Sequence, residues 1–323
     1  MSRLLTIQEY VTGLRAGDIA VLSKAITLIE SSKLEHKQLA QELIDAILPF
    51  TGKSVRIGIT GVPGVGKSTF IESFGMHLIN EGKKVAVLAI DPSSSISKGS
   101  ILGDKTRMEK LSIHPNAFIR PSASSGSLGG VTYKTHEATL LCEAAGFDTI
   151  IIETVGVGQS ETEVSTISDF FLLLMLAGAG DELQGIKRGI MEMADGVAIT
   201  KADGANAAKA KGARAEYANA LHFLPPNESG WIPEVKTCSS YEGIGINEIH
   251  EMIEKFVQHQ TTKGFFNSKR KEQNLFAFRR LLDEQLKNNF LAQKAVMEKM
   301  KQLEQDVLIG SISPYSAVYK LLQ

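Results

Sequence analysis

The sequence predicts an α/β fold: a doubly wound, mainly parallel sheet covered by helices, with further helices before and after it. Short runs rich in β-branched and aromatic residues alternate with stretches of helical periodicity across residues 51–262. Most of these runs are almost entirely apolar, as expected for parallel strands that are buried on both faces. Such alternation is typical of one α/β core. The expected strands are VRIGIT, KVAVLAID, AFIR, DTIIIE, DFFLLLML, GVAIT and EVKTC.

Residues 1–50 are expected to form an N-terminal helical extension. Apolar residues recur there at helical spacing, and Asp18 precedes the first stripe as a candidate N-cap. A second stretch, HKQLAQELIDAILPF, repeats the periodicity and ends near a proline. The first stripe consists of Ile19, Leu22, Ile26 and Ile29.

Residues 263–323 are also expected to be helical, with two apolar stripes that must be buried against another surface. The pattern favours two explanations equally: packing on the core of the same chain, or a helical arm that clasps a second subunit. The first stripe is Leu275, Phe278, Leu282 and Leu286, and the second is Val296, Met300, Leu303 and Val307.

The composition is that of an ordinary globular protein. The chain has 323 residues, is 43% hydrophobic and carries a formal net charge of −1. The sequence lacks the basic excess that would indicate a nucleic-acid partner. The most apolar run, FFLLLMLAGAG, is far shorter than the ~20 residues that span a bilayer. The first residues lack a signal-peptide pattern. We therefore expect a cytoplasmic protein, or a mitochondrial matrix protein if it is eukaryotic and processed. Cys142 and Cys238 are expected to be buried free thiols in a reducing compartment.

The segment GVPGVGKS matches the phosphate-binding pattern G-x-x-x-x-G-K-[ST], and it lies between an expected strand and an expected helix. Glycines let successive backbone N–H groups turn toward phosphate oxygens, and the helix N-terminus adds partial positive charge. Lys67 is expected to reach the β- and γ-phosphates as a catalytic residue, and the Ser68 hydroxyl to bind Mg²⁺. The sequence thus predicts the P-loop NTPase fold. The candidate phosphate-binding residues are Gly61, Gly64, Val65, Gly66, Lys67, Ser68 and Thr69.

The strand GVAIT runs into TKAD, which matches the guanine-recognition pattern [NT]-K-x-D. Asp203 can accept hydrogen bonds from N1–H and the exocyclic amine of guanine, groups that adenine lacks, and the Lys201 stem can lie across the base. Thr200 stands where Asn is commoner. A plain helix cap is the alternative interpretation. Downstream, Ser239 in TCSSYEGIG is a candidate for a backbone N–H that approaches the guanine oxygen.

Acidic residues at the ends of expected strands are candidate Mg²⁺ ligands. Glu153 ends DTIIIE, and the spacing E-x-x-G to Gly156 would put a carboxylate near the metal and an N–H near the γ-phosphate. We predict Glu153 to be catalytic as well. Asp91 ends VLAID in the same way, and Asp104 follows in SILGDKTR. For each acid, a helix cap or a solvated turn is the alternative.

Three other functions compete with that of a simple GTPase. A metal-delivering GTPase would want a cysteine or histidine cluster, but the seven histidines and two cysteines show no H-x-x-H or C-x-x-C spacing. A small-molecule kinase or transport ATPase would prefer ATP, and Asp203 argues against it. A nucleotide-gated scaffold is the third alternative. No G-x-S-x-G motif indicates a serine hydrolase.

Taken together, several loops resemble the methylmalonyl-CoA mutase-associated GTPase chaperones, a family that includes the methylmalonic aciduria type A proteins and is often labelled as an arginine/ornithine transport ATPase. The resemblance extends through essentially the whole chain. It rests on GVPGVGKST, AIDPSSS, GSILGDKTRM, RPSASSGSLGGV, IIETVGVGQSE, LAGAGDELQGIKRGIMEMAD and TKADG.

This resemblance implies a homodimeric GTPase that docks on an adenosylcobalamin-dependent acyl-CoA mutase, gates cofactor loading and protects the mutase. It implies that the terminal helices form the dimer arm. The residue after Gly156 is Val157, so the water-orienting glutamine of small signalling GTPases is missing there, and we expect slow turnover without a partner. By resemblance, Ser68, Asp91, Asp104 and Glu153 would surround Mg²⁺, and Asp181, Gln184 and Lys187 would form a switch that couples nucleotide state to the partner.

Overall fold

The computed structural model describes residues 3–31, 33–90, 108–121, 128–154, 160–178, 188–225 and 227–323. The chain divides into two compact units, residues 1–271 and 272–323. The boundaries expected from the sequence, at residues 50 and 262, stay predictions. Part of the predicted site lies outside the described residues: Asp91, Asp104, Gly156, Asp181, Gln184 and Lys187.

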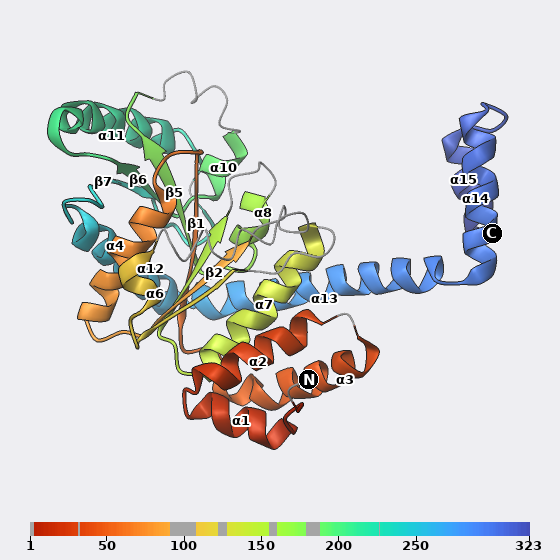
Figure 1. The fold of residues 1–323 in the computed structure, drawn as a ribbon. Helices are drawn as coiled ribbons and strands as arrows, with labels where there is room; N and C mark the ends of the chain where they lie inside the picture. Colours follow the sequence, from red (N-terminus) through yellow and green to blue (C-terminus); the bar gives the residue numbers. More distant parts are fainter. Residues whose placement is uncertain are drawn as a thin grey trace. The chain divides into compact units, whose positions relative to one another are not determined.

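A seven-stranded sheet in the order β3-β2-β4-β1-β5-β6-β7 forms the centre of the first unit, and every strand pair in it is parallel (Figure 1). Each of the seven runs expected as strands forms one of these strands, so the predicted α/β fold class is confirmed. The strands are β1 (Val55–Gly61), β2 (Val85–Ile90), β3 (Ala117–Pro121), β4 (Thr149–Thr154), β5 (Phe170–Leu176), β6 (Gly196–Thr200) and β7 (Glu234–Thr237).

Helices cover both faces of the sheet, which explains why most of the strands are almost entirely apolar. In β2, Val85 and Val87 pack with one core cluster while Ala86 and Leu88 pack with another, because successive side chains of a strand point to opposite faces. One face lies under α4 and α12, the other under α7 and the N-terminal helices. The helices and short turns around the sheet are α4 (Lys67–Asn80), α6 (Glu109–Ser112), α7 (Leu128–Ala144), α8 (Ser160–Ser165), α10 (Arg188–Met193), η2 (Gly204–Asn206), α11 (Ala207–His222) and α12 (Ile246–Thr262).

The N-terminal helices pack against α7 and extend the core on that face. Asp18 is the N-cap that the sequence predicts, since its carboxylate accepts hydrogen bonds from the N–H groups of Ala20 (2.8 Å) and Val21 (3.1 Å). Ile19, at the start of its helix, is exposed, whereas the rest of its stripe is buried. These elements are α1 (Ile7–Arg15), α2 (Ile19–Glu30), α3 (Leu34–Ile47) and the short turn η1 (Leu48–Phe50).

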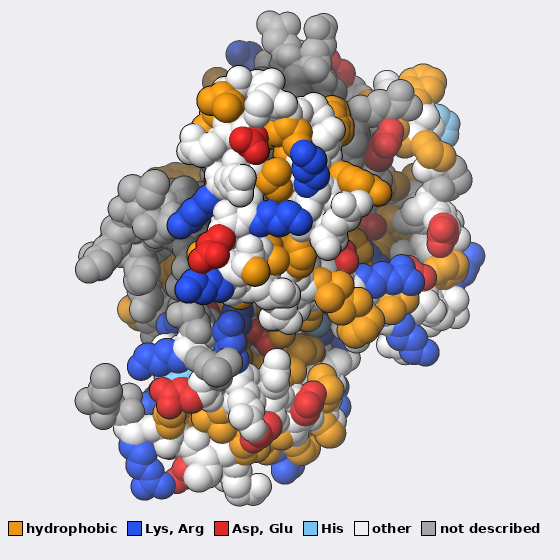
Figure 2. Space-filling view, turned by 90° about the vertical axis from the view of Figure 1, so that its right-hand side faces the viewer, with side chains coloured by type: hydrophobic (Ala, Val, Ile, Leu, Met, Phe, Trp, Pro, Cys, Tyr) orange, Lys and Arg blue, Asp and Glu red, His pale blue; other side chains and the backbone are white. Residues whose placement is uncertain are grey.

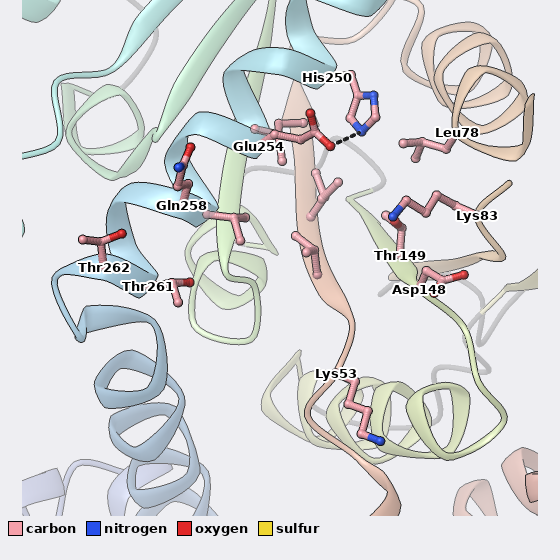
Figure 3. Close-up of a pocket in the computed structure, with 14 residues that line it drawn as sticks. Lys53, Leu78, Lys83, Asp148, Thr149, His250, Glu254, Gln258, Thr261 and Thr262 are labelled. Carbon is pink, nitrogen blue, oxygen red and sulfur yellow. Dashed lines mark ion pairs between the residues drawn. The ribbon is translucent and has the colours of Figure 1, made fainter. Parts of the chain in front are cut away.

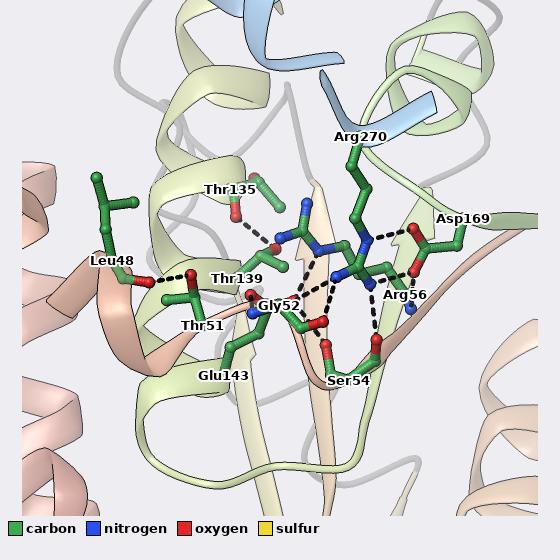
Figure 4. Close-up of polar contacts among 10 residues, drawn as sticks. All are labelled: Leu48, Thr51, Gly52, Ser54, Arg56, Thr135, Thr139, Glu143, Asp169 and Arg270. Atoms are coloured by element: carbon green, nitrogen blue, oxygen red, sulfur yellow. Dashed lines mark hydrogen bonds and ion pairs between the residues drawn. The ribbon is translucent and has the colours of Figure 1, made fainter. Parts of the chain in front are cut away.

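A buried charge network lies at the amino ends of the central strands (Figure 4). Arg270, in the first turns of α13 (Phe265–Leu291), donates to both carboxylate oxygens of Asp169, at 2.8 and 2.6 Å. The same guanidinium donates to the carbonyl oxygens of Gly52 (2.9 Å) and Ser54 (2.6 Å). The beginning of α13 is thereby fixed to the segments that lead into β1 and β5.

A second buried ion pair continues this network. The Arg56 guanidinium lies 2.9 Å from the Glu143 carboxylate of α7, which also accepts a 2.6 Å hydrogen bond from the Ser54 hydroxyl. The backbone N–H of Arg56 donates to Asp169 at 2.8 Å. Because each of these charges has an opposite charge and several hydrogen bonds, the cost of burying it is offset.

The second unit contains the remainder of α13 together with α14 (Lys294–Leu308) and α15 (Pro314–Leu322), and the last two helices pack against each other. The two predicted apolar stripes differ in burial. In the second stripe, Leu303 is buried, whereas the first stripe is exposed: Leu275 (48%), Phe278 (60%), Leu282 (46%) and Leu286 (59%).

The surface carries charges of both signs. On the face that Figure 2 presents, hydrophobic side chains lie between scattered lysine, arginine and acidic side chains. Among the helices that the structure describes, none combines the length and the apolar character needed to cross a bilayer.

Candidate functional site

The phosphate loop lies between β1 and α4, and its glycines are required for two different physical reasons. Gly64 (φ +78°) and Gly66 (φ +90°) adopt left-handed backbone conformations that side chains disfavour. Gly61 instead lies so close to β5 that an added Cβ would come within 2.5 Å of the Leu174 carbonyl oxygen. The conformation of the loop therefore depends on the backbone freedom of glycine at its tip and on close packing against β5 at its base.

The Lys67 ammonium turns back onto its own loop. Its Nζ donates a 2.8 Å hydrogen bond to the Gly61 carbonyl oxygen. Burial lowers the pKa of Lys67, and the nearby carboxylates of Glu153 and Glu161 act in the opposite direction. Glu161, buried in α8, was not singled out from the sequence, because no motif spacing relates it to the phosphate loop.

Ser68 and Glu153 come together beside this lysine. The Ser68 hydroxyl lies 3.4 Å from Oε1 of Glu153 and donates to it. Glu153 is 5% exposed and stands near the end of β4, which pairs with β1. A hydroxyl and a carboxylate are the hard oxygen ligands that Mg²⁺ prefers, so these two residues fit the expected metal.

A pair of buried threonines joins the same two strands, and sequence analysis missed it. The Thr154 hydroxyl donates a 2.9 Å hydrogen bond to the Thr60 hydroxyl, which connects the end of β4 to the end of β1. The exposed fractions of the two side chains are 0% and 1%. This bond fixes the position of Glu153 relative to the phosphate loop. Thr60 directly precedes the phosphate loop and Thr154 directly follows Glu153, but neither motif assigns a role to its neighbouring threonine.

The base-recognition motif is bonded directly to the phosphate loop. The Thr200 hydroxyl, at the end of β6, lies 2.7 Å from the Val65 carbonyl oxygen and 3.3 Å from that of Met175. The next side chain, Lys201, donates from Nζ to the Gly64 carbonyl oxygen at 2.8 Å, and its backbone has a positive φ of 54°. Such a conformation is uncommon for a residue other than glycine and is often found at functional sites.

Asp203 and Ser239 form the other half of this motif. The Ser239 hydroxyl donates a 2.6 Å hydrogen bond to Oδ2 of Asp203, and the Ala202 N–H donates to the Cys238 carbonyl oxygen at 3.0 Å. The Ser239 N–H donates to the Ile244 carbonyl oxygen at 2.9 Å. The guanine contact expected of that N–H stays a prediction, and it would require this bond to be replaced.

Both cysteines are free and fully buried, as the sequence predicts. Burial raises the pKa of the Cys142 thiol and raises the pKa of Cys238 to about 12. Neither thiol is therefore available as a nucleophile at neutral pH.

The structure gathers the described part of the predicted site at the carboxyl ends of β1, β4, β6 and β7. Ligands bind at this edge in open parallel sheets. The functional roles of these residues remain predictions. The gathered residues are Gly61, Gly64, Val65, Gly66, Lys67, Ser68, Thr69, Glu153, Thr200, Lys201, Asp203 and Ser239.

Comparison with protein families gives a match over most of the chain. Residues 22–295 match the family described as methylmalonyl-CoA mutase-associated GTPase MeaB. The chain belongs to this family. The resemblance inferred from the loops is thereby confirmed, and so is the prediction that the protein is a GTPase.

Relatives across bacteria and animals agree with this assignment. A probable GTPase of Mycobacterium tuberculosis is 47% identical over 98% of this chain and 95% of its own length. The GTPase ArgK of Escherichia coli is 46% identical, over 98% of this chain and 96% of its own length. The mitochondrial methylmalonic aciduria type A homolog of mouse is 44% identical, over 98% and 79%.

Among solved structures, one described as a LAO/AO transport system kinase is 40% identical. It matches with a TM-score of 0.79 and covers 99% of this chain and 98% of that one. This member of the family thus has a solved relative with the same fold over nearly its entire length.

Proposed function

We propose that the protein binds GTP with Mg²⁺, and that binding and hydrolysis of GTP change its affinity for an adenosylcobalamin-dependent acyl-CoA mutase. This change in affinity gates cofactor loading and protects the mutase from inactivation. The observation that carries this proposal is the direct contact between the two halves of the site, in which Lys201 Nζ lies 2.8 Å from the Gly64 carbonyl oxygen. The family description, which names a mutase, supports the partner.

Asp203 is proposed to provide the selectivity for guanine. Its Oδ2 already accepts from the Ser239 hydroxyl, which orients the carboxylate. An ionised carboxylate held in this way accepts from N1–H and the exocyclic amine of guanine, whereas adenine has neither donor at those positions.

The phosphates are proposed to bind to the loop that contains Gly61, Lys67 and Ser68. On binding, Lys67 exchanges the Gly61 carbonyl for oxygens of the β- and γ-phosphates, and loop N–H groups donate to the same oxygens. Ser68 and Glu153, with Asp91 and Asp104 from outside the described residues, would hold Mg²⁺. Bound there, Mg²⁺ would neutralise phosphate charge as it develops.

Hydrolysis is proposed to be slow until a partner binds. Val157 follows Gly156, where small signalling GTPases carry a water-orienting glutamine, so no side chain at that position aligns the attacking water. Asp181, Gln184 and Lys187 are proposed to couple the nucleotide state to the partner. Single-turnover rates with and without the purified mutase test this, and equal rates would contradict it.

A homodimer is proposed to form through the C-terminal helices. The exposed stripe Leu275, Phe278, Leu282 and Leu286 is an apolar face of a kind that monomeric proteins rarely leave uncovered. A second copy of the same arm offers the same face, which suits a symmetric interface.

A nucleotide exchange experiment tests guanine recognition. Asp203→Asn is expected to weaken GTP binding roughly a hundredfold or more, because two charge-assisted hydrogen bonds of about 1.5–3 kcal/mol each are lost. Xanthosine triphosphate should regain affinity, since xanthine carries an oxygen where guanine has the amine. Asp45→Asn, on the exposed surface of α3, is the matched control. A preference for ATP in the unchanged protein, with phosphate transfer to an acceptor, would instead support a kinase.

The partner is tested separately. The dissociation constant for an adenosylcobalamin-dependent acyl-CoA mutase is measured with GDP and with a non-hydrolysable GTP analogue, together with the rates of cofactor loading and of mutase inactivation. We expect the three quantities to depend on the nucleotide. Equal values in both nucleotide states would exclude the gating role while leaving guanine recognition intact.

A further inference from the structure

A pair of histidines joins α4 to α12 on the face of the sheet that these two helices cover. Nε2 of His77, in α4, lies 3.1 Å from Nδ1 of His250, in α12, and the two imidazole rings are nearly perpendicular, with an interplanar angle of 81°. The two residues are 173 positions apart, so no sequence spacing indicates the pair. His77 lies in the last turn of α4, whereas the phosphate loop leads into the first turn, so the pair is separate from the nucleotide site.

The surroundings of His250 orient its ring and leave it open to solvent on one side. The ring lies edge-on to that of Phe74, three residues before His77, with the centroids 6.2 Å apart. His250 also lines a groove of about 420 Å³ between α12 and the segment that joins α4 to β2 (Figure 3), and its side chain is 14% exposed. The groove gives water access to this imidazole.

Glu254 favours one of the two neutral forms of His250. Its Oε1 lies 3.6 Å from Nε2 of His250, one turn earlier in the same helix (Figure 3). A carboxylate at this position favours a proton on Nε2, so the lone pair of the neutral ring is on Nδ1, the atom that faces His77. Histidines that bind metal ions commonly present their other ring nitrogen to a carboxylate in this way.

The charges around the pair favour a cation. Each histidine is followed one helical turn later by an exposed glutamate, Glu81 after His77 and Glu254 after His250. In the described part of the chain, these two carboxylates act on His250 against the single ammonium group of Lys83. Burial lowers the pKa of His250, so this imidazole is neutral at pH 7, which is the form that binds metal ions.

We propose that His77 and His250 bind a divalent transition-metal ion such as Zn²⁺, Ni²⁺ or Cu²⁺, the ions that imidazole suits. Two Zn–N bonds of about 2.0–2.1 Å that meet at roughly 90–110° place their nitrogens about 2.8–3.4 Å apart, and the observed 3.1 Å lies within this range. The described residues gather no group of three or more candidate ligands, so water from the groove completes the coordination.

The ion replaces the hydrogen bond between the two rings and connects α4 directly to α12. The proton that His77 carries on Nε2 in the hydrogen-bonded pair then resides on its Nδ1, after exchange with solvent, while His250 keeps its proton on Nε2. The metal should therefore raise the melting temperature of the protein. This binding does not depend on the proposed function, because it involves neither the phosphate loop nor the base-recognition motif.

Metal titration of the intact chain tests the proposal. Excess Mg²⁺ is present throughout, so that it competes for sites made of oxygen ligands, and Zn²⁺ binding is measured by calorimetry. Cu²⁺ is expected to bind more tightly than Zn²⁺, and Ca²⁺, which prefers oxygen ligands, is expected not to compete. His77→Gln and His250→Gln should each weaken Zn²⁺ binding by roughly tenfold or more. His222→Gln, on the exposed surface of α11, should leave it unchanged.

Nitrogen NMR identifies the ligating atoms in the unaltered chain, without any substitution. In protein labelled with ¹⁵N-histidine, Zn²⁺ should shift the resonances of His77 Nε2 and His250 Nδ1 and leave Nε2 of His250 protonated. Glu254→Gln removes the charge that favours this tautomer and should weaken Zn²⁺ binding by roughly tenfold. Glu248→Gln, also exposed on α12, is the matched control and should have little effect.

Three outcomes would overturn the proposal. They are equal Zn²⁺ affinity in the unaltered chain and in both histidine variants, competition by Ca²⁺ as strong as that by Cu²⁺, and imidazole resonances of the pair that Zn²⁺ does not shift. Any of these would show that the two rings form a hydrogen-bonded pair only. Melting temperatures measured without metal establish that each variant is folded.

Discussion

The Thr200 hydroxyl donates a 2.7 Å hydrogen bond to the carbonyl oxygen of Val65, so the strand that ends in the base-recognition motif holds the phosphate loop in place. This contact explains how threonine can stand where asparagine is commoner. A hydroxyl supplies the single donor that the buried carbonyl requires, without any contact to the base.

Thr200→Val should therefore weaken GTP binding although the residue does not need to touch guanine. Valine has the same shape but leaves the buried Val65 carbonyl without its donor, at a cost of about 1–3 kcal/mol. A roughly tenfold increase in the dissociation constant, measured by calorimetry, is expected. Thr200→Ser keeps the hydroxyl and should restore most of the affinity. If the serine variant behaves like the valine variant, the hydrogen bond is not the cause.

Glu153→Gln should raise the Mg²⁺ concentration at which GTP binding reaches half its maximum by roughly tenfold. Glutamine keeps the shape of the side chain but removes the charge, and a polar contact to a charged group contributes about 1.5–3 kcal/mol, against about 0.5–1.5 kcal/mol for a neutral one. Magnesium titration of GTP binding measures the effect. Glu35→Gln, on the exposed surface of α3, is the control, and equal shifts in both variants would contradict a metal-binding role for Glu153.

The stability of the protein should decrease in mild acid because of His250. Burial lowers the pKa of this imidazole, and His77, whose Nε2 lies 3.1 Å from its Nδ1, lowers it further. Lys83 acts in the same direction, whereas Glu254 and Glu81 act in the opposite one. The unfolded chain then binds more protons, so the contribution of His250 to stability is complete above a pH of about 6.5 and is lost as the pH falls toward the folded-state pKa.

Denaturant unfolding of the unaltered protein and of His250→Gln, at a series of pH values, measures this effect. The difference in unfolding free energy between the two proteins should shrink as the pH falls below about 6.5. A difference that is constant across this range would show that His250 does not titrate as the geometry indicates.

Arg270→Met should destabilise the first unit by about 3–5 kcal/mol, because it leaves the buried Asp169 carboxylate without its main partner. Urea unfolding measures the loss. Arg279→Met, at an exposed position of the same helix, should have little effect. Adding Asp169→Asn to Arg270→Met should recover part of the loss, and strict additivity of the two changes would contradict a direct interaction.

Phe278→Glu combined with Leu282→Glu should convert the proposed dimer into a monomer, since two charges would then lie in the apolar interface. Light scattering measures the mass, and unfolding curves report whether the helices remain folded. Lys301→Glu, at an exposed position of α14, is the control. A monomeric mass for the unaltered chain at micromolar concentration would count against the dimer.

The sequence predicted those parts of the molecule whose signal is local. All seven strands were predicted, most of them from apolar runs, because a parallel strand buried on both faces needs apolar residues in succession. The phosphate loop was recognisable because its glycines and lysine must follow one another along the backbone. Asp18 was recognisable because an N-cap acts within three residues of itself.

Contacts between distant segments could not be predicted in this way. Arg270 and Asp169 are 101 residues apart, and the Thr60 and Thr154 hydroxyls are 94 residues apart. No sequence pattern relates either residue of a pair to its partner, so only the folded backbone brings the partners together. The bond from the Ser239 N–H to Ile244 was missed for a related reason: its partner depends on the shape of a turn that the residue types alone do not specify.

The hydrogen bonds that Arg270 donates to Asp169 and to the segment before β1 also determine which shortened chains should remain stable. A fragment that stopped at the end of α12, at Thr262, would lose the guanidinium that satisfies Asp169 and the carbonyls before β1. A fragment that holds the nucleotide-binding part should therefore be stable only when it extends through residue 271. Proteolytic cleavage within the first turns of α13 should likewise lower the melting temperature below that of the intact chain.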